Sequence, residues 1–185
     1  ETSASALNWT WYLLSQHPRI ERELHAAIDA APEPEALGSE DALRIPFVRQ
    51  VLKESMRLYP PVPILSRECL ADDEIRGRRV PKGSIMMVVP WLLHRHELLW
   101  ERPHEFVPER FLPEWPKRHA KFSYVPFSAG PRICLGAAFA LSEAVICLAT
   151  LAQAFALRRR AASRCDCERS PWMRFDLRSR FSRMW

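Results

Sequence analysis

The sequence predicts a mainly α-helical fold with small β-sheets, which places it in the α+β class. Apolar residues recur at helical spacing over several long stretches, whereas strand-like alternation is confined to short ones. A proline-rich segment without clear periodicity, from Pro103 to Pro126, contains five prolines. The chain has 185 residues, which is enough for one domain with a sizeable core.

Prolines mark the boundaries of the helices expected in the first third of the chain. Pro18 and Pro46 suit the first turn of a helix, whereas Pro32 and Pro60 cannot continue one. The expected helices cover residues 2–15, 18–31 and 46–58, with one short helical turn at residues 39–43.

The rest of the chain predicts short strands and one long apolar helix. Alternating stretches at residues 62–67, 84–89 and 172–181 are expected to be strands, with a turn at Gly77. The run from 137 to 157 predicts a helix. Its uncharged part, residues 144–157, is too short to span a bilayer, so we expect a buried core helix.

Charge and cysteine usage exclude some classes of function. The net charge is +5, and residues 158–185 hold nine arginines against three acidic residues, but no aromatic platform or zinc-finger spacing indicates nucleic-acid binding. Five cysteines without a disulfide-framework spacing favour a reducing compartment. The pair Cys165 and Cys167 lacks a second ligand pair nearby, so we interpret it as two free thiols in a loop.

One loop carries the strongest chemical signal. Cys134 lies between Gly130 and Gly136, which can take positive φ or let another body approach the backbone. The cysteine is expected at or next to a helix start, where the helix dipole favours a thiolate, and Arg132 adds a positive charge. Such a thiolate suits a nucleophile or a metal ligand, whereas a lone cysteine before an apolar helix is more often a small buried side chain.

The pattern Phe-x-x-Gly-x-Arg-x-Cys-x-Gly, from Phe127 to Gly136, resembles the haem-binding loop of the cytochrome P450 family at all five defined positions. The resemblance implies that Cys134 is the axial ligand of the iron of haem b (iron protoporphyrin IX). It also implies that Phe127, Gly130, Arg132 and Gly136 contact the haem.

A second signature of the same family lies in the helix expected at residues 46–58. Glu54 and Arg57 share a helix face that carries apolar residues, and an ion pair facing the core needs a further partner. Arg110, in the sequence Pro108-Glu109-Arg110-Phe111, is similar to the family's third member of this set. The resemblance implies a structural role for the three residues, which lock the helix to the segment leading into the cysteine loop.

Two further matches are implied by the resemblance. Glu1 and Thr2 are similar to the acid–threonine pair that relays protons on the distal side of the haem, although the same residues also suit a helix N-terminal cap. Arg67 follows Arg57 by ten residues, where the family commonly places a partner for a haem propionate; an exposed strand residue is the alternative.

The resemblance covers nearly the whole chain and implies that residues 1–185 are the C-terminal haem-binding portion of a single domain whose N-terminal part is absent. The implied function is a monooxygenase that inserts one atom of O₂ into an apolar small-molecule substrate, with electrons from a ferredoxin or a flavoprotein reductase. Some of Lys117, Arg118, Lys121 and Arg132, which lie near Cys134 in the sequence, are candidates for a basic patch that docks an acidic partner.

Two alternatives to this function remain open at the level of the sequence. One is a haem-thiolate peroxygenase, isomerase or dehydratase on the same scaffold. The other is a fragment without activity of its own. The implied location is the cytoplasm, or a membrane reached through an N-terminal anchor that is not in this chain.

Overall fold

The computed structural model describes residues 1–31, 37–114, 120–159 and 173–177. The helices are α1 (Thr2–Gln16), α2 (Pro18–Asp29), α3 (Ser39–Arg44), α4 (Pro46–Leu58), α5 (Pro90–Leu93) and α7 (Ala137–Ala154), with 3-10 turns η2 (Pro108–Phe111) and η3 (Gly130–Arg132). The strands are β1 (Leu65–Glu68), β2 (Asp73–Ile75), β3 (Arg78–Val80), β4 (Ile85–Val88), β5 (Phe155–Arg159) and β6 (Met173–Leu177). This architecture confirms the predicted α+β class.

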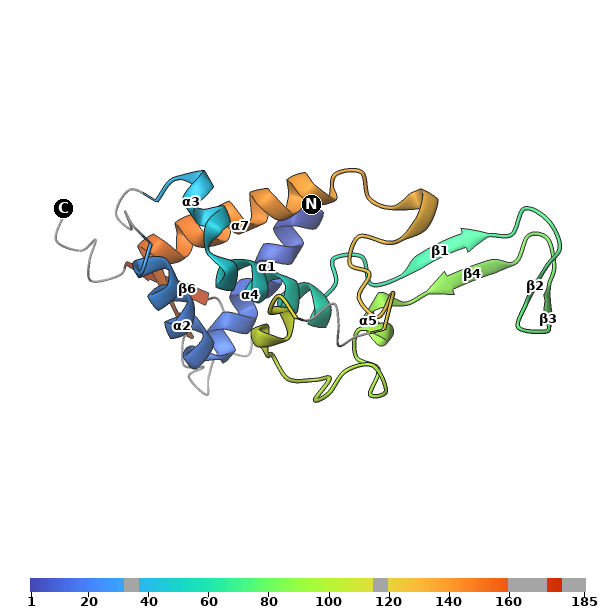
Figure 1. The fold of residues 1–185 in the computed structure, drawn as a ribbon, viewed down its shortest axis with the longest axis horizontal. Helices are drawn as coiled ribbons and strands as arrows, with labels where there is room; N and C mark the ends of the chain where they lie inside the picture. Colours follow the sequence, from blue (N-terminus) through green and yellow to red (C-terminus); the bar gives the residue numbers. More distant parts are fainter. Residues whose placement is uncertain (32–36, 115–119, 160–172, 178–185) are drawn as a thin grey trace, which may run out of the picture.

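The core lies where α1, α2, α3 and α4 pack around α7 (Figure 1). α7 is long and apolar enough to cross a membrane by composition alone. One face of α7 enters the protein core, with Val145, Leu148, Ala149 and Ala152 fully buried. Of the whole span, 33% is buried in the described part of the chain, so α7 packs on the core through this face and the predicted burial holds only in part.

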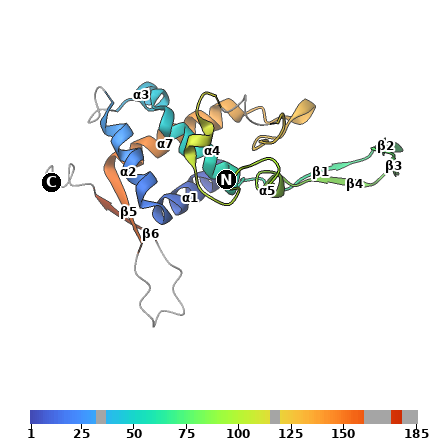
Figure 2. The same ribbon diagram turned by 60° about the horizontal axis from the view of Figure 1, so that its bottom comes forward.

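The strands form three separate antiparallel pairs, β1–β4, β2–β3 and β5–β6. The first two pairs make one long hairpin that projects away from the helices, with β2 and β3 at its tip (Figures 1 and 2). At the turn between β2 and β3, Arg76 and Gly77 both have positive φ, 51° and 77°. The predicted turn at Gly77 is thus confirmed, and the first strand is shorter than the predicted 62–67.

The long apolar run does not stay helical to residue 157, so that boundary prediction is wrong. The helix ends at Ala154, and Phe155 has the extended backbone angles φ −125° and ψ 146°. From there β5 pairs with β6, with Phe155 opposite Leu177 and Arg159 opposite Met173. The hydrogen bonds of this strand pair outweigh the helical preference of the apolar run. The predicted strand residues 172 and 178–181 lie outside the described part of the chain.

The buried Arg57 side chain donates five hydrogen bonds to described residues. Its Nε donates to Glu54 Oε2 at 2.8 Å, and its Nη2 donates to Glu54 Oε1 at 2.9 Å. The guanidinium also donates to the carbonyl oxygens of His94, at 2.7 Å, of Pro103, at 2.7 Å, and of Glu105, at 2.9 Å. Both Arg57 and Glu54 are fully buried. One guanidinium therefore holds three carbonyls of a segment that has little regular structure of its own.

The carboxylate of Glu54 holds the same segment from the other side of the pair. Its Oε1 accepts the Val107 N–H at 2.9 Å and the Arg110 Nε at 3.3 Å. Arg110 also donates from Nη2 to the Arg102 carbonyl at 2.7 Å. The structure thus brings Glu54, Arg57 and Arg110 together, in the arrangement that the sequence predicted.

His94 links this network to the beginning of the cysteine loop. Its backbone carbonyl accepts from Arg57, and its Nε2 accepts the Val125 N–H at 2.9 Å. Next to Val125, the Tyr124 hydroxyl donates to the Lys53 carbonyl of α4 at 3.0 Å. Burial, assisted by the positive charge of Arg57, lowers the pKa of His94 from 6.5 to about 4. A neutral imidazole is required here because a protonated Nε2 could not accept the Val125 N–H.

We expect Glu54→Gln to lower the free energy of unfolding by roughly 3–5 kcal/mol, because it leaves the buried Arg57 guanidinium without its counter-charge. Urea unfolding followed by circular dichroism measures the change. The matched control is Glu105→Gln, which breaks an exposed pair with Arg102 at 2.9 Å and should cost less than about 1 kcal/mol. Equal losses in the two variants would contradict a structural role for the Glu54 pair.

We expect the stability of the protein to fall as the pH drops from 6.5 toward about 4, the range between the unfolded and folded pKa values of His94. In this range the unfolded chain binds the proton and the folded chain does not, so acid favours unfolding. The loss specific to His94 is on the order of 3 kcal/mol. It is measured as the difference in unfolding free energy between the wild type and His94→Gln, which can still accept the Val125 N–H. His104→Gln, at an exposed position, should retain the full pH dependence; a His94→Gln variant that does the same would refute the assignment.

Candidate functional site

The loop before α7 folds back on itself and presents Cys134. The Cys134 N–H donates to the Phe127 carbonyl at 3.0 Å, and the Ile133 N–H donates to the Gly130 carbonyl at 3.0 Å. Gly130 has φ 73°, as predicted for a glycine in this loop, and Ser128 has φ 66°. Because a residue with a side chain is strained in that region, the loop carries a conformational cost that its hydrogen bonds offset.

The second glycine of the loop serves a different purpose. Gly136 has φ −85°, which any residue adopts, so it is not needed for the turn itself. No heavy atom lies within 4 Å of the point where a Cβ would stand on Gly136. The open space beside this backbone allows another body to come close, which is the second use expected of these glycines.

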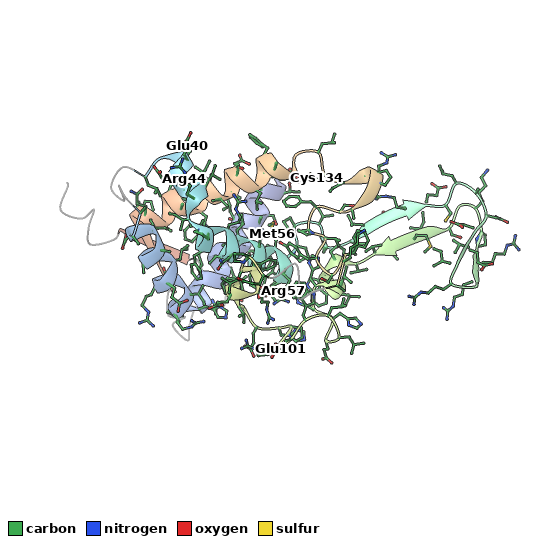
Figure 3. The ribbon with its side chains drawn as sticks, viewed as in Figure 1. Glu40, Arg44, Met56, Arg57, Glu101 and Cys134 are labelled. Atoms are coloured by element: carbon green, nitrogen blue, oxygen red, sulfur yellow. The ribbon has the colours of Figure 1, made fainter. Side chains whose placement is uncertain are left out.

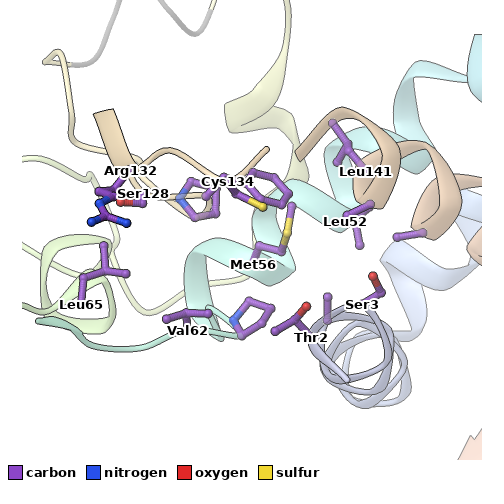
Figure 4. A pocket seen from close by; sticks show the side chains of 16 residues that line it. Thr2, Ser3, Leu52, Met56, Val62, Leu65, Ser128, Arg132, Cys134 and Leu141 are labelled. Carbon is purple, nitrogen blue, oxygen red and sulfur yellow. The ribbon is translucent and has the colours of Figure 1, made fainter. Parts of the chain in front are cut away.

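A pocket of about 230 Å³ lies beside Cys134. It is bounded by the start of α1, the middle of α4, the residues before β1, the cysteine loop and the first half of α7 (Figure 4). Its lining is mostly apolar and consists of Thr2, Ser3, Ala6, Leu52, Met56, Pro61, Val62, Leu65, Pro126, Phe127, Ser128, Arg132, Cys134, Ala140, Leu141 and Ala144. The pocket therefore joins five segments that are far apart in the sequence.

Cys134 is exposed and lies three residues before the first residue of α7. It is thus close to the helix N-terminus, although not on the helix itself. Arg132 lines the same pocket and supplies a positive charge (Figure 4). A cysteine and an arginine that line one apolar pocket are suited to hold a metal-bearing group that also carries acidic substituents.

The structure brings some of the predicted site residues together and leaves others apart. Thr2, Phe127, Arg132 and Cys134 all line the pocket. Glu1 precedes Thr2 but is exposed and does not line the pocket. Neither Gly130 nor Gly136 contributes to the lining, although both belong to the loop that holds Cys134.

Arg67 also lies apart from the pocket. It is exposed on β1, and its Nη1 donates to the carbonyl of the preceding Ser66 at 2.7 Å. This is the exposed strand position that the sequence left as the alternative for Arg67. A role for Arg67 toward the cofactor stays a prediction.

The sequence analysis missed the contribution of α4 to this pocket. Leu52 and Met56 line it, one helical turn apart (Figure 4), while Glu54 and Arg57 bond within the network described above. The signal was available, because two large apolar residues at a spacing of four share a helix face. The sequence alone does not show which face of α4 the cysteine loop packs against.

The residues present fit a flat, largely apolar cofactor that is held by a thiolate. The lining offers one thiol, the thioether of Met56, one guanidinium and mostly apolar side chains. Gly136 leaves its side of the loop free of atoms. Among the described residues no group of three histidine, cysteine or acidic side chains is arranged to hold a bare metal ion.

Comparison with known proteins is consistent with this geometry. Residues 1–175 match the sequence profile of the family described as Cytochrome P450. The chain is similar to cyclooctatin synthase of Streptomyces melanosporofaciens, with 39% identity over 85% of this chain and 34% of that protein. It is also 36% identical to cytochrome P450 4V2 of Rattus norvegicus, over 84% of this chain and 30% of the relative. A third relative, leukotriene-B4 omega-hydroxylase 3 of Mus musculus, is 37% identical over 80% of this chain and 29% of its own length. The chain thus spans about a third of the length of these curated relatives.

Proposed function

This chain belongs to the cytochrome P450 family, and from that premise we propose that it is the haem-binding portion of a haem-thiolate monooxygenase. The reaction is the insertion of one atom of O₂ into an apolar organic substrate. The single observation that carries the proposal is the position of Cys134, exposed at the edge of an apolar pocket and beside Arg132.

The proposal treats residues 1–185 as the C-terminal portion of one domain. Matches that cover only 28–34% of the relatives' lengths support this interpretation. The activity, the substrate and the partners are proposed for the whole protein.

The roles of the individual residues follow from their positions around the pocket. Cys134 holds the iron of haem b through its thiolate, and the bound haem supplies the chemistry of O₂ activation. Arg132 pairs with a haem propionate through its planar fork, a role that we propose for Arg67 as well. Phe127 packs against the cofactor, while Gly130 shapes the loop and Gly136 leaves room beside it.

Proton delivery is assigned to the start of α1. Thr2 lines the pocket, and we assign to its Oγ1 the donation of a proton toward the space in front of Cys134. Glu1, the residue before it, supplies that proton from the exposed side of the helix. The apolar side chains Leu52, Met56 and Val62 exclude water around this point and favour an apolar substrate.

Electrons come from a separate protein, a ferredoxin or a flavoprotein reductase. Lys121 and Arg132 are exposed and lie near Cys134 in the sequence, and we propose that they belong to a basic patch for docking. Lys117 and Arg118, the other basic residues considered for this role, lie outside the described part of the chain.

One observation favours the alternative that the 185 residues have no activity of their own. Three apolar side chains around the cysteine loop are exposed: Ile133 to 52%, Leu135 fully and Phe139 to 74%. Apolar exposure of this extent next to a site indicates that another surface covers it. The cofactor, the rest of the protein, or both provide that cover.

We expect the reduced, CO-treated protein, reconstituted with haem, to show the strongly red-shifted Soret band of thiolate ligation. Cys134→Ser should lose this band because an alcohol is not a thiolate ligand. The control is Cys69→Ser, a half-buried thiol in the hairpin and not in the pocket lining, which should keep it. The same band in Cys134→Ser would refute the assignment, and haem uptake only by a longer protein that contains this chain would support the alternative without independent activity.

A further inference from the structure

A second cleft opens at the other end of α1, away from Cys134. It measures about 410 Å³ and shares no residue with the pocket described above. The C-terminal ends of α1 and α4 form one side, and α5 with the residues after it forms the other. Its lining consists of Tyr12, Leu13, Gln16, His17, Leu58, Tyr59, Trp91, Arg95, His104 and Phe106.

Arg95 is the charged group of this cleft, and it is only partly exposed. Its guanidinium carbon lies 4.3 Å from the centre of the Trp91 ring and 5.3 Å from the centre of the Tyr59 ring. Two aromatic faces therefore hold the guanidinium in place. Burial lowers the pKa of Arg95 from its ordinary value, which shows that its charge is incompletely solvated.

Within the described part of the chain, no carboxylate lies within ion-pair distance of Arg95. The one hydrogen bond of its guanidinium to the described residues runs from Nη1 to the Trp91 carbonyl at 3.3 Å. The contrast with Arg57 is direct, because that guanidinium has a carboxylate and three carbonyls. The Arg95 guanidinium is thus held between two rings and has no carboxylate partner among the residues that the structure describes.

The side chains around Arg95 indicate what kind of molecule would carry its counter-charge. Tyr12 is 41% exposed and Trp91 is 43% exposed, so both present aromatic surface to solvent. Phe106 and Leu58 close the cleft from below. The polar lining groups, from Gln16, His17 and His104, include no acid. The cleft thus combines one planar cation with flat apolar surfaces.

We propose that this cleft is a binding site for a carboxylate attached to a flat apolar body, with Arg95 as its ion-pair partner. A guanidinium presents two parallel N–H groups that match the two oxygens of a carboxylate. A single arginine between aromatic rings favours a monoanion over a phosphate dianion, which needs more positive charge. The occupant is a free aromatic acid; an acidic side chain of the protein beyond this chain, which carries no flat apolar body, is the competing outcome of the test. The proposal does not depend on haem binding.

The test uses benzoate as the probe and benzyl alcohol as its uncharged counterpart, with binding followed by calorimetry. Benzoate should bind the 185-residue chain, and Arg95→Gln should weaken it at least tenfold, in line with the contribution of about 1.5–3 kcal/mol that a hydrogen bond to a charged group makes. Arg95→Lys keeps the positive charge but loses the planar guanidinium. Its affinity for benzoate should lie between those of the wild type and Arg95→Gln. Benzyl alcohol should bind weakly and should not respond to either change.

The matched control is Arg102→Gln, which removes an exposed arginine outside the cleft and should leave benzoate binding unchanged. Circular dichroism verifies that Arg95→Gln is folded, and Arg95→Lys serves if it is not. Benzoate binding that is absent from the wild type, or that is unchanged in the Arg95 variants, overturns the proposal. Binding to both this chain and a longer protein that contains it supports a free acid as ligand. Binding to this chain alone supports an acidic side chain of the longer protein.

Discussion

The buried ion pair between Arg57 and Glu54 is the constraint on which the rest of the structure depends. Two charges in a dry interior are costly unless all their hydrogen-bonding groups are satisfied. Here the hydrogen-bond partners are three carbonyl groups and one amide N–H of the irregular segment between His94 and Arg110. The pair therefore fixes the path of a segment that has almost no helix or strand to fix it. Through His94 and Val125 the same constraint reaches the cysteine loop.

The parts of the fold that could be predicted from the sequence are those with local causes. The helix boundaries at Pro18 and Pro46 follow from the chemistry of proline, and the turn at Gly77 follows from its freedom to take positive φ. The cysteine loop was recognisable because several fixed residues lie close together. The end of α7 at Ala154 was not, since an apolar run has the same appearance in a helix and in a paired strand.

The candidate site was only partly accessible from the sequence, for a related reason. Cys134, Arg132 and Thr2 were found by their resemblance to a pattern, but the function of His94 depends on a contact across the fold. The spacing of residues in the sequence does not indicate that His94 accepts the Val125 N–H. The positive φ of Ser128 could not be predicted either, because serine is a common residue in loops of any conformation. Both features arise from how distant segments meet.

The neighbouring positions Met56 and Arg57 of α4 face different surroundings (Figure 3). A change at Met56 or Leu52 alters the shape of the pocket while the ion pair behind it stays intact. A change at Arg57 would disturb the path of the whole following segment. Substitutions at Leu52 and Met56 can therefore change the ligand that the pocket accepts, while the ion pair that stabilises the fold is kept.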